Sequence, residues 1–118
     1  MKYTLPIRTV NRNNARLHWA ALHRATRDER RAACLLTRSV LDIAATARIE
    51  RLGAVITLTR IGKRKMDSDN LAGCLKGIRD GIAEAIGVDD GDDRLRWVYE
   101  QRTEWRYAVE VEVLTNEP

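Results

Sequence analysis

The chain has no phenylalanine and only two prolines and two cysteines among its 118 residues. The prolines stand close to the two ends, at Pro6 and Pro118, and no Gly/Ser-rich tract, low-complexity segment or internal repeat interrupts the sequence. A chain of this length without linker signals is typical of one domain built around one modest core. We therefore predict a single domain that spans residues 1–118.

Long hydrophobic runs are also missing. No stretch is apolar for the roughly 20 residues that a membrane span needs, and Met1 to Pro6 lacks the apolar region of a signal peptide. Cys34 and Cys74 each fall within an apolar helical pattern, with no second Cys, His or carboxylate at ligand spacing. We interpret both as reduced packing residues. The sequence predicts a soluble, cytoplasmic protein with no membrane partner.

Charge is unevenly distributed, although the net charge is only +4. Cations dominate the segment 12–38, which holds Arg12, Arg16, Arg24, Arg27, Arg30, Arg31 and Arg38. A second cluster consists of Arg60, Lys63, Arg64 and Lys65. These residues form either a solvated helix face with a polar loop or a phosphate-binding surface. In the second case we expect DNA contacts from Arg12, Arg16, Lys63, Arg64 and Lys65.

Acidic residues gather at two places, Asp67-Ser68-Asp69-Asn70 and Asp89-Asp90-Gly91-Asp92-Asp93, separated by about five helical turns. Clustered carboxylates raise one another's pKa and oppose ionisation, and a bound cation offsets that cost. Asp69 or Asn70 is also a natural helix N-cap. A cap explains one carboxylate but not the pair Asp67 and Asp69. The pattern predicts a divalent-metal site, with Mg²⁺ favoured by the oxygen ligands and Mn²⁺ as a substitute.

Hydrophobic periodicity predicts the order β-α-β-α-β-β. Residues 2–9 alternate as in a strand, and 15–48 contain no Gly or Pro, which favours one long helix or two joined by a kink. Leu52 to Arg60 is typical of a second strand. After the Asp-rich helix, Leu95 to Tyr99 and Tyr107 to Val113 alternate, and we expect them to pair as an antiparallel hairpin. The fold class is an α/β single-domain sandwich in which helices cover a mixed four-stranded sheet.

The helix between the two acidic groups has distinct faces. Its core stripe consists of Leu71, Cys74, Leu75, Ile78, Ile82 and Ile86. Lys76 lies on the opposite face, and we expect it to reach back toward Asp67 and Asp69 or a phosphate bound there. Three glycines recur at a spacing of four, at positions 73, 77 and 81, where each costs about 1 kcal/mol relative to Ala. They indicate close packing of another element against the helix or, alternatively, a direct phosphate contact.

The aromatic residues allow several interpretations. Trp97, Tyr99 and Tyr107 occupy alternating strand positions and are expected in the core or in a dimer interface. Trp19 begins an Arg-rich helix, where it either stacks on an unpaired base or anchors a partner subunit. Trp105 stands near the expected hairpin tip, where a dimer contact is plausible.

The succession of these motifs resembles the RusA-type Holliday junction resolvases, crossover junction endodeoxyribonucleases that phages and prophages often encode. The resemblance covers the Asn-rich stretch 11–14, the basic helix, the strand that runs into an Arg/Lys loop, Asp67-Ser68-Asp69-Asn70-Leu71, and Gly87-Val88-Asp89-Asp90. It implies a RusA-like fold and a homodimer that cuts four-way DNA junctions symmetrically during recombination and repair.

The resemblance also implies the roles of individual acids. The family's metal-binding catalytic acids are both aspartates of Asp-x-Asp and the second aspartate of Asp-Asp, which transfer to Asp67, Asp69 and Asp90. Asp89 and Asp93 remain alternatives for the third ligand. The implied reaction is Mg²⁺-dependent hydrolysis of a phosphodiester by a metal-activated water.

A lysine completes the implied site. The family lysine would stand at Gly73, whereas this chain has Lys76 one turn later, and we expect Lys76 to stabilise charge on the phosphate oxygens. Asn14 of the Asn-rich stretch is expected to contact DNA. The displaced lysine motivates an alternative, a non-catalytic accessory protein that binds DNA junctions. A hydrolase of small phosphorylated molecules ranks last, because the sequence has no P-loop, and we expect no nucleotide cofactor.

Overall fold

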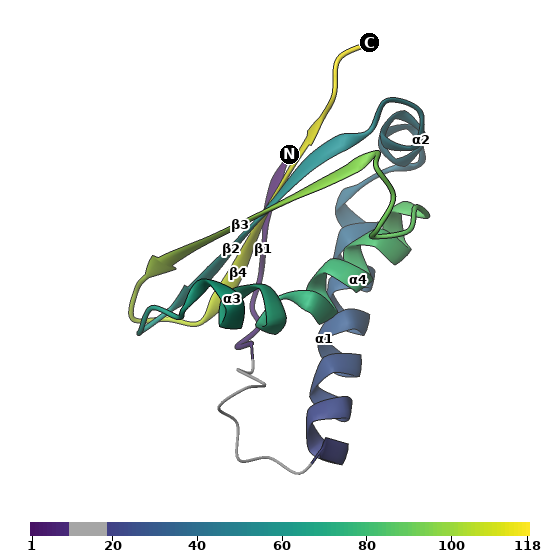
Figure 1. The fold of residues 1–118 in the computed structure, drawn as a ribbon. Helices are drawn as coiled ribbons and strands as arrows, with labels where there is room; N and C mark the ends of the chain where they lie inside the picture. Colours follow the sequence, from purple (N-terminus) through teal and green to yellow (C-terminus); the bar gives the residue numbers. More distant parts are fainter. Residues whose placement is uncertain (10–18) are drawn as a thin grey trace.

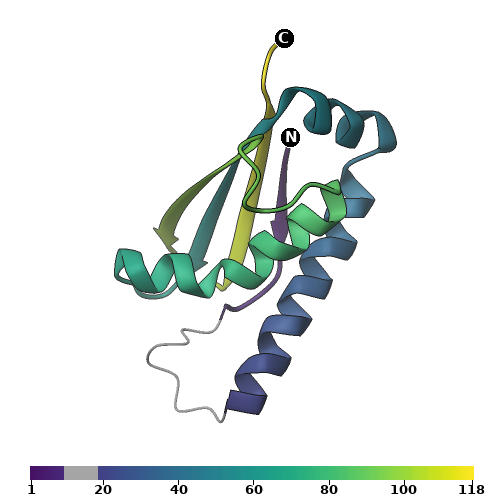
Figure 2. The same ribbon diagram turned by 45° about the vertical axis from the view of Figure 1, so that its right-hand side comes forward.

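The computed structural model describes residues 1–9 and 19–118, in which four helices pack on one face of a four-stranded sheet (Figure 1, Figure 2). The elements follow in the order β1 (Lys2–Leu5), α1 (Trp19–Val40), α2 (Ile43–Leu52), β2 (Ala54–Gly62), α3 (Ser68–Cys74), α4 (Lys76–Ile86), β3 (Leu95–Thr103) and β4 (Ala108–Thr115). The α/β class and the mixed four-stranded sheet are confirmed.

The strands are ordered β1-β4-β2-β3 across the sheet. Strand β2 is parallel to β3 and antiparallel to β4, and β1 is antiparallel to β4. The predicted hairpin is therefore wrong, because β2 separates β3 from β4. Strand β2 is buried along most of its length, whereas β3 carries exposed charges such as Glu100 and Arg102. An apolar strand gains most from a central place and a charged strand is suited to an edge.

The elements at the N-terminal end are shorter than predicted. Strand β1 ends at Leu5 because Pro6 has no N–H to donate to the sheet. The helix expected over 15–48 consists of α1 and α2 from residue 19 onward, and residues 15–18 lie outside the described part of the chain. Asp42 separates the two helices, since its carboxylate accepts a hydrogen bond of 2.7 Å from Ala45 N and caps α2.

The Asp-rich helix is also divided in two. The break is at Leu75, whose backbone angles are φ −95° and ψ −2°. The expected cap at Asp69 or Asn70 is wrong, because the N-cap residue of α3 is Asp67. The core stripe is confirmed, with exposures of 6% or less at Leu71, Cys74, Leu75, Ile78, Ile82 and Ile86.

Two of the three glycines allow α4 to pack closely against α1. A Cβ at Gly81 would lie 2.2 Å from the carbonyl oxygen of Arg30, and one at Gly77 would lie 3.0 Å from that of Thr26. A Cβ at Gly73 would meet nothing within 4 Å. The close-packing interpretation is therefore confirmed for Gly77 and Gly81 only.

The core lies between the helices and one face of the sheet, where Ile56, Leu58 and Val111 are fully buried. Cys34 and Cys74 are buried, and neither forms a disulfide bond in the described chain, as expected of reduced packing residues. Among the described residues, no helix is both long enough and apolar enough to traverse a bilayer.

Candidate functional site

The two ends of the acidic segment are fastened to the same face of β3. Met66, which precedes Asp67, donates its N–H to Gln101 Oε1 (2.9 Å) and accepts from Gln101 Nε2 (2.7 Å). At the other end, Trp97 Nε1 donates to the carbonyl oxygen of Asp90 (2.9 Å). Side chains four positions apart on a strand lie on one face, about 13 Å from each other. Strand β3 thus fixes the spacing of the two acidic groups.

At the start of α3, two carboxylates have no partner among the described residues. Asp67 is the N-cap residue, but its side chain makes no capping hydrogen bond. Asp69 lies in the first turn, and both residues are exposed. Neither side chain has a hydrogen bond or ion pair with any other described residue. The capping explanation therefore fails for Asp67, and the oxygens of both carboxylates are available as ligands for a metal ion.

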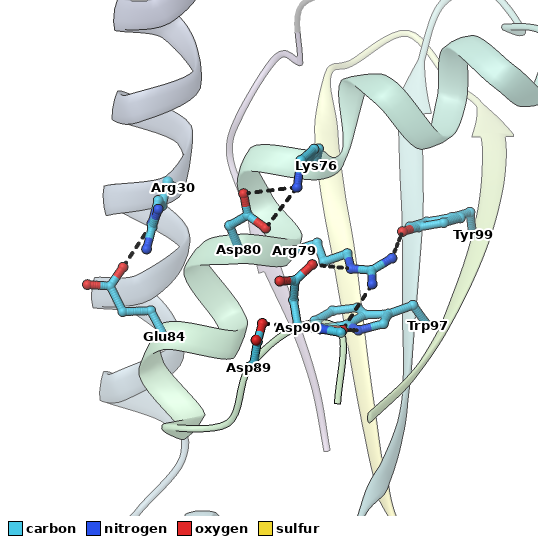
Figure 3. A network of polar contacts seen from close by, with 10 residues as sticks. Arg30, Lys76, Arg79, Asp80, Glu84, Asp89, Asp90, Trp97 and Tyr99 are labelled. Atoms are coloured by element: carbon cyan, nitrogen blue, oxygen red, sulfur yellow. Dashed lines mark hydrogen bonds and ion pairs between the residues drawn. The ribbon is translucent and has the colours of Figure 1, made fainter. Parts of the chain in front are cut away.

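Beyond the end of α4, Asp90 is held by Arg79 (Figure 3). Arg79 Nε lies 3.0 Å from Asp90 Oδ2, and Nη2 donates to the Asp90 carbonyl oxygen (2.9 Å). Nη1 donates to the Tyr99 hydroxyl (2.8 Å), and the guanidinium stands 5.1 Å from the centre of the Trp97 ring. The Nε contact is not aligned as a hydrogen bond, so this buried N–H lacks one. Burial opposes the charge on Arg79, but Tyr99 and Asp90 outweigh it and raise the pKa.

Sequence reasoning did not find Arg79. Something positive was expected beside the acidic groups, and for Asp90 that positive group is the guanidinium of Arg79. A signal was available, since Arg79 is the only arginine between Met66 and Asp93. Trp97 and Tyr99 pack against the core as expected, and their polar atoms also hold the Asp90–Arg79 pair.

Lys76 lies in a different place from the one expected. Its ammonium is 3.4 Å from Asp80 Oδ1, one turn further along α4, rather than directed at Asp67 and Asp69 (Figure 3). A groove of about 430 Å³ passes this pair. The groove is lined by Arg30, Lys76, Asp80, Ala83, Glu84, Gly87, Val88, Asp89 and Asp90. The structure therefore brings Lys76 and Asp90 to one groove, which Asp67 and Asp69 do not line.

The remaining acids after α4 shape the loop. Asp89 Oδ1 accepts from Gly91 N at 3.3 Å. Asp92 accepts from both the main-chain N and the guanidinium of Arg94, which lowers the pKa of Asp92 to about 2. Of the three alternatives for a third ligand, Asp89 and Asp90 line the groove and Asp93 does not.

These acids form two separate groups of possible metal ligands, one at the start of α3 and one after the end of α4. Within residues 1–9 and 19–118, no three His, Cys, Asp or Glu side chains are grouped so that they could hold a metal ion. Asp67 and Asp69 fit a hard cation by their chemistry, because they are exposed carboxylates without a partner in the described part of the chain. Asp90 is less suited to bind a cation, because its carboxylate is already paired with the Arg79 guanidinium.

The loop before α3 carries three exposed cations, Lys63, Arg64 and Lys65. Arg60 differs from them, since it is 7% exposed and its Nη1 donates to the carbonyl oxygen of Arg64 at 2.7 Å. Arg60 therefore shapes the loop from inside, while the three exposed cations are separated from Asp67 by Met66 alone.

Helix α1 carries a second cationic surface. Arg24, Arg27, Arg31 and Arg38 are exposed and lie within about 60° of one another around the helix. They extend over about 21 Å of its length, and none has an ion pair with a described residue. The other expected DNA contacts, Arg12, Asn14 and Arg16, lie outside the described residues.

No protein-family model matches the sequence, and no curated protein is significantly similar to it. What the protein does must therefore be inferred from its residues and their arrangement.

Proposed function

We propose that this protein is a Mg²⁺-dependent endonuclease that resolves four-way DNA junctions by paired phosphodiester hydrolysis, with Mn²⁺ as a substitute metal. The observation that carries the proposal is the pair Asp67 and Asp69, two exposed carboxylates without a partner among the described residues. Neighbouring carboxylates destabilise each other when nothing neutralises them. Their presence at one helix start, two residues after a run of three cations, fits a site for a metal and a phosphate.

The surrounding charge supports a DNA substrate. A purely acidic site repels DNA, whereas cations that neutralise phosphates release bound counterions and favour binding. Lys63, Arg64 and Lys65 precede the acids, with only Met66 between Lys65 and Asp67. The four arginines of α1 that have no ion pair with a described residue provide an extended cationic surface.

Each acid and cation has a defined part in the proposed reaction. Asp67 and Asp69 would hold the Mg²⁺ ion, which when bound acts as a Lewis acid and makes a water more acidic. Asp90 is paired with Arg79 in this conformation, so its participation as a third ligand requires that pair to open. Lys76 offers its ammonium to phosphate oxygens that gain charge during the reaction.

A symmetric dimer suits this substrate. A four-way junction presents equivalent strands, and a two-fold symmetric protein addresses two of them with identical sites. We therefore propose a homodimer that acts on junction DNA in the cytoplasm during recombination and repair.

The deciding experiment is cleavage of a labelled synthetic four-way junction beside a linear duplex of matched sequence, in Mg²⁺, Mn²⁺ and EDTA. We expect paired, symmetric nicks in the junction alone, lost in EDTA and in Asp67→Asn and Asp69→Asn. Asp92→Asn is the matched control, because Arg94 already holds that acid in a surface turn, and it should cut normally. Unchanged cleavage by a folded Asp69→Asn protein would contradict the proposal.

One observation favours the alternative, a junction-binding accessory protein that cuts nothing. Asp90 is occupied by Arg79, and the described residues hold no three-ligand group. Tight junction binding without cleavage in either metal would support this alternative.

A further inference from the structure

Aromatic and cationic side chains gather where β2 ends and β4 begins. The Trp105 cluster, as we call it, consists of Arg8, Lys63, Trp105 and Tyr107. Lys63 Nζ lies 5.9 Å from the centre of the Trp105 ring and 5.7 Å from that of Tyr107. The Arg8 guanidinium lies 4.2 Å from the centre of the Tyr107 ring. Two cations are therefore held against two aromatic rings.

The turn that carries Trp105 is fixed by its own contacts. Glu104 N donates to the carbonyl oxygen of Gly62 (2.9 Å), which ties the turn to the end of β2. The Glu104 carboxylate binds both Arg102 and Arg106, and these guanidinium groups lower its pKa. The Glu104 carboxylate is thus already paired with two arginines, and Lys63 has no acidic partner among the described residues.

Trp105 itself contributes little to the fold. Its side chain is 90% exposed, the highest value among the large apolar residues of the described chain. The neighbours of an exposed aromatic that anchors a protein partner are mostly apolar and exclude water. Here the neighbours are charged: Lys63 faces the ring, and Glu104 and Arg106 adjoin Trp105 in the chain. An exposed ring beside Lys63, which has no acidic partner among the described residues, combines the two features that bind single-stranded nucleic acid, a stacking platform and phosphate-binding charge.

We propose that the Trp105 cluster is a binding site for an unpaired nucleotide, with the base stacked on Trp105 and the adjacent phosphates bound by Lys63 and Arg8. The site lies close to the proposed cutting centre. Met66 is held by Gln101, and the four residues from Gln101 to Trp105 extend over at most about 14 Å. A nucleic-acid strand bound at Trp105 therefore passes near Asp67. The role of this path in cleavage rests on the proposed nuclease function, whereas base stacking on Trp105 does not.

The first test measures binding in EDTA, so that it does not depend on metal or cleavage. A labelled ten-nucleotide oligothymidylate and a blunt duplex of equal length are titrated with protein by fluorescence anisotropy. We expect Trp105→Ala to weaken oligothymidylate binding by about 5- to 50-fold and duplex binding by less than about twofold. Trp105→Phe should recover most of the affinity, because its ring still stacks. Ile43→Ala, which removes a similarly exposed apolar side chain from α2, is the matched control and should change neither.

Tryptophan fluorescence provides a second measurement, because a base stacked on the Trp105 ring quenches its emission. Oligothymidylate should quench the tryptophan fluorescence of the wild type, but not that of Trp105→Phe. Lys63→Gln should weaken binding and reduce the slope of log affinity against log salt by about 0.7, the value for one phosphate contact to a single strand.

Two results would overturn the inference. One is unchanged oligothymidylate affinity in Trp105→Ala. The other is a change in sedimenting mass for that variant, which would make Trp105 a contact between copies of the chain. Failure of the nuclease proposal has a different signature: the junction is never cut, while Trp105-dependent binding in EDTA persists.

Discussion

The acids at the start of α3 and those beyond the end of α4 have opposite surroundings. Asp67 and Asp69 are exposed and unpaired within the described chain. Asp90 is half-buried and held by Arg79 through its carboxylate and its carbonyl oxygen. The same residue type is therefore available to a ligand at one end and serves the fold at the other. Local counter-charge, rather than the number of acids in a motif, decides which role an aspartate has.

This contrast predicts opposite responses to mutation. Removing one partner of a partly buried pair such as Asp90 and Arg79, whose side chains are 27% and 26% exposed, leaves the other charge without compensation, which lowers the free energy of unfolding. Removing one of two unpaired like charges relieves repulsion. The variants that follow test the contrast by their effect on stability, from the largest expected loss to the smallest.

Arg79→Ala should have the largest effect. It removes the hydrogen bonds to the Tyr99 hydroxyl and the Asp90 carbonyl oxygen and leaves the Asp90 carboxylate without its partner. We expect the free energy of unfolding to fall by about 2–4 kcal/mol, measured by urea denaturation. Arg48→Ala, which removes an exposed arginine from α2, is the control and should change it by less than about 0.5 kcal/mol. A loss below about 1 kcal/mol for Arg79→Ala would contradict the assigned role.

Gln101→Leu should cause the second-largest loss in the free energy of unfolding. Gln101 donates to and accepts from the main chain of Met66, and both bonds are lost in this variant. We expect a loss of about 1–2 kcal/mol and faster amide exchange at Met66 and Asp67. Glu100→Gln, on the opposite face of β3, is the control. Equal amide exchange in Gln101→Leu and the wild type would show that β3 does not position the acids.

Local features of the fold were predictable because local periodicity encodes them. The stripe from Leu71 to Ile86 faces the core because its residues recur at helical spacing. The glycines at 77 and 81 indicated close helix packing because glycine is otherwise costly inside a helix. Both inferences require only the sequence of this helical segment and no knowledge of the rest of the chain.

Features that depend on distant segments were not predictable. The insertion of β2 between β3 and β4 joins residues far apart, such as Thr57 with Val98 and with Glu112, and no local pattern specifies that pairing. The role of Arg79 likewise depends on where β3 places Tyr99. The reach of Lys76 was misjudged because Asp80, on the same face, is a nearer partner.

Asp92→Asn should have a smaller effect that depends on pH. Arg94 lowers the pKa of Asp92 from 3.8 to about 2. A carboxyl whose pKa is lower in the folded state stabilises the protein above its unfolded pKa, and this contribution is lost as the pH falls through about 2. The variant should therefore have a slightly lower urea midpoint than the wild type at pH 6, and the difference should shrink toward pH 2. A constant difference across this range would exclude ionisation of Asp92 as its cause.

The double variant Asp67→Asn/Asp69→Asn should change stability least. It relieves repulsion between two unpaired charges but also removes negative charge from a helix N-terminus, where each charge is worth about 0.3–1 kcal/mol. These terms oppose each other, so we expect a net change within about 0.5 kcal/mol. If the pair binds Mg²⁺, added Mg²⁺ should raise the thermal midpoint of the wild type and leave that of the double variant unchanged, because a ligand stabilises only the state that binds it. Equal shifts in both proteins would place the ion elsewhere, and a large loss of stability would mean that these carboxylates, like Asp90, serve the fold.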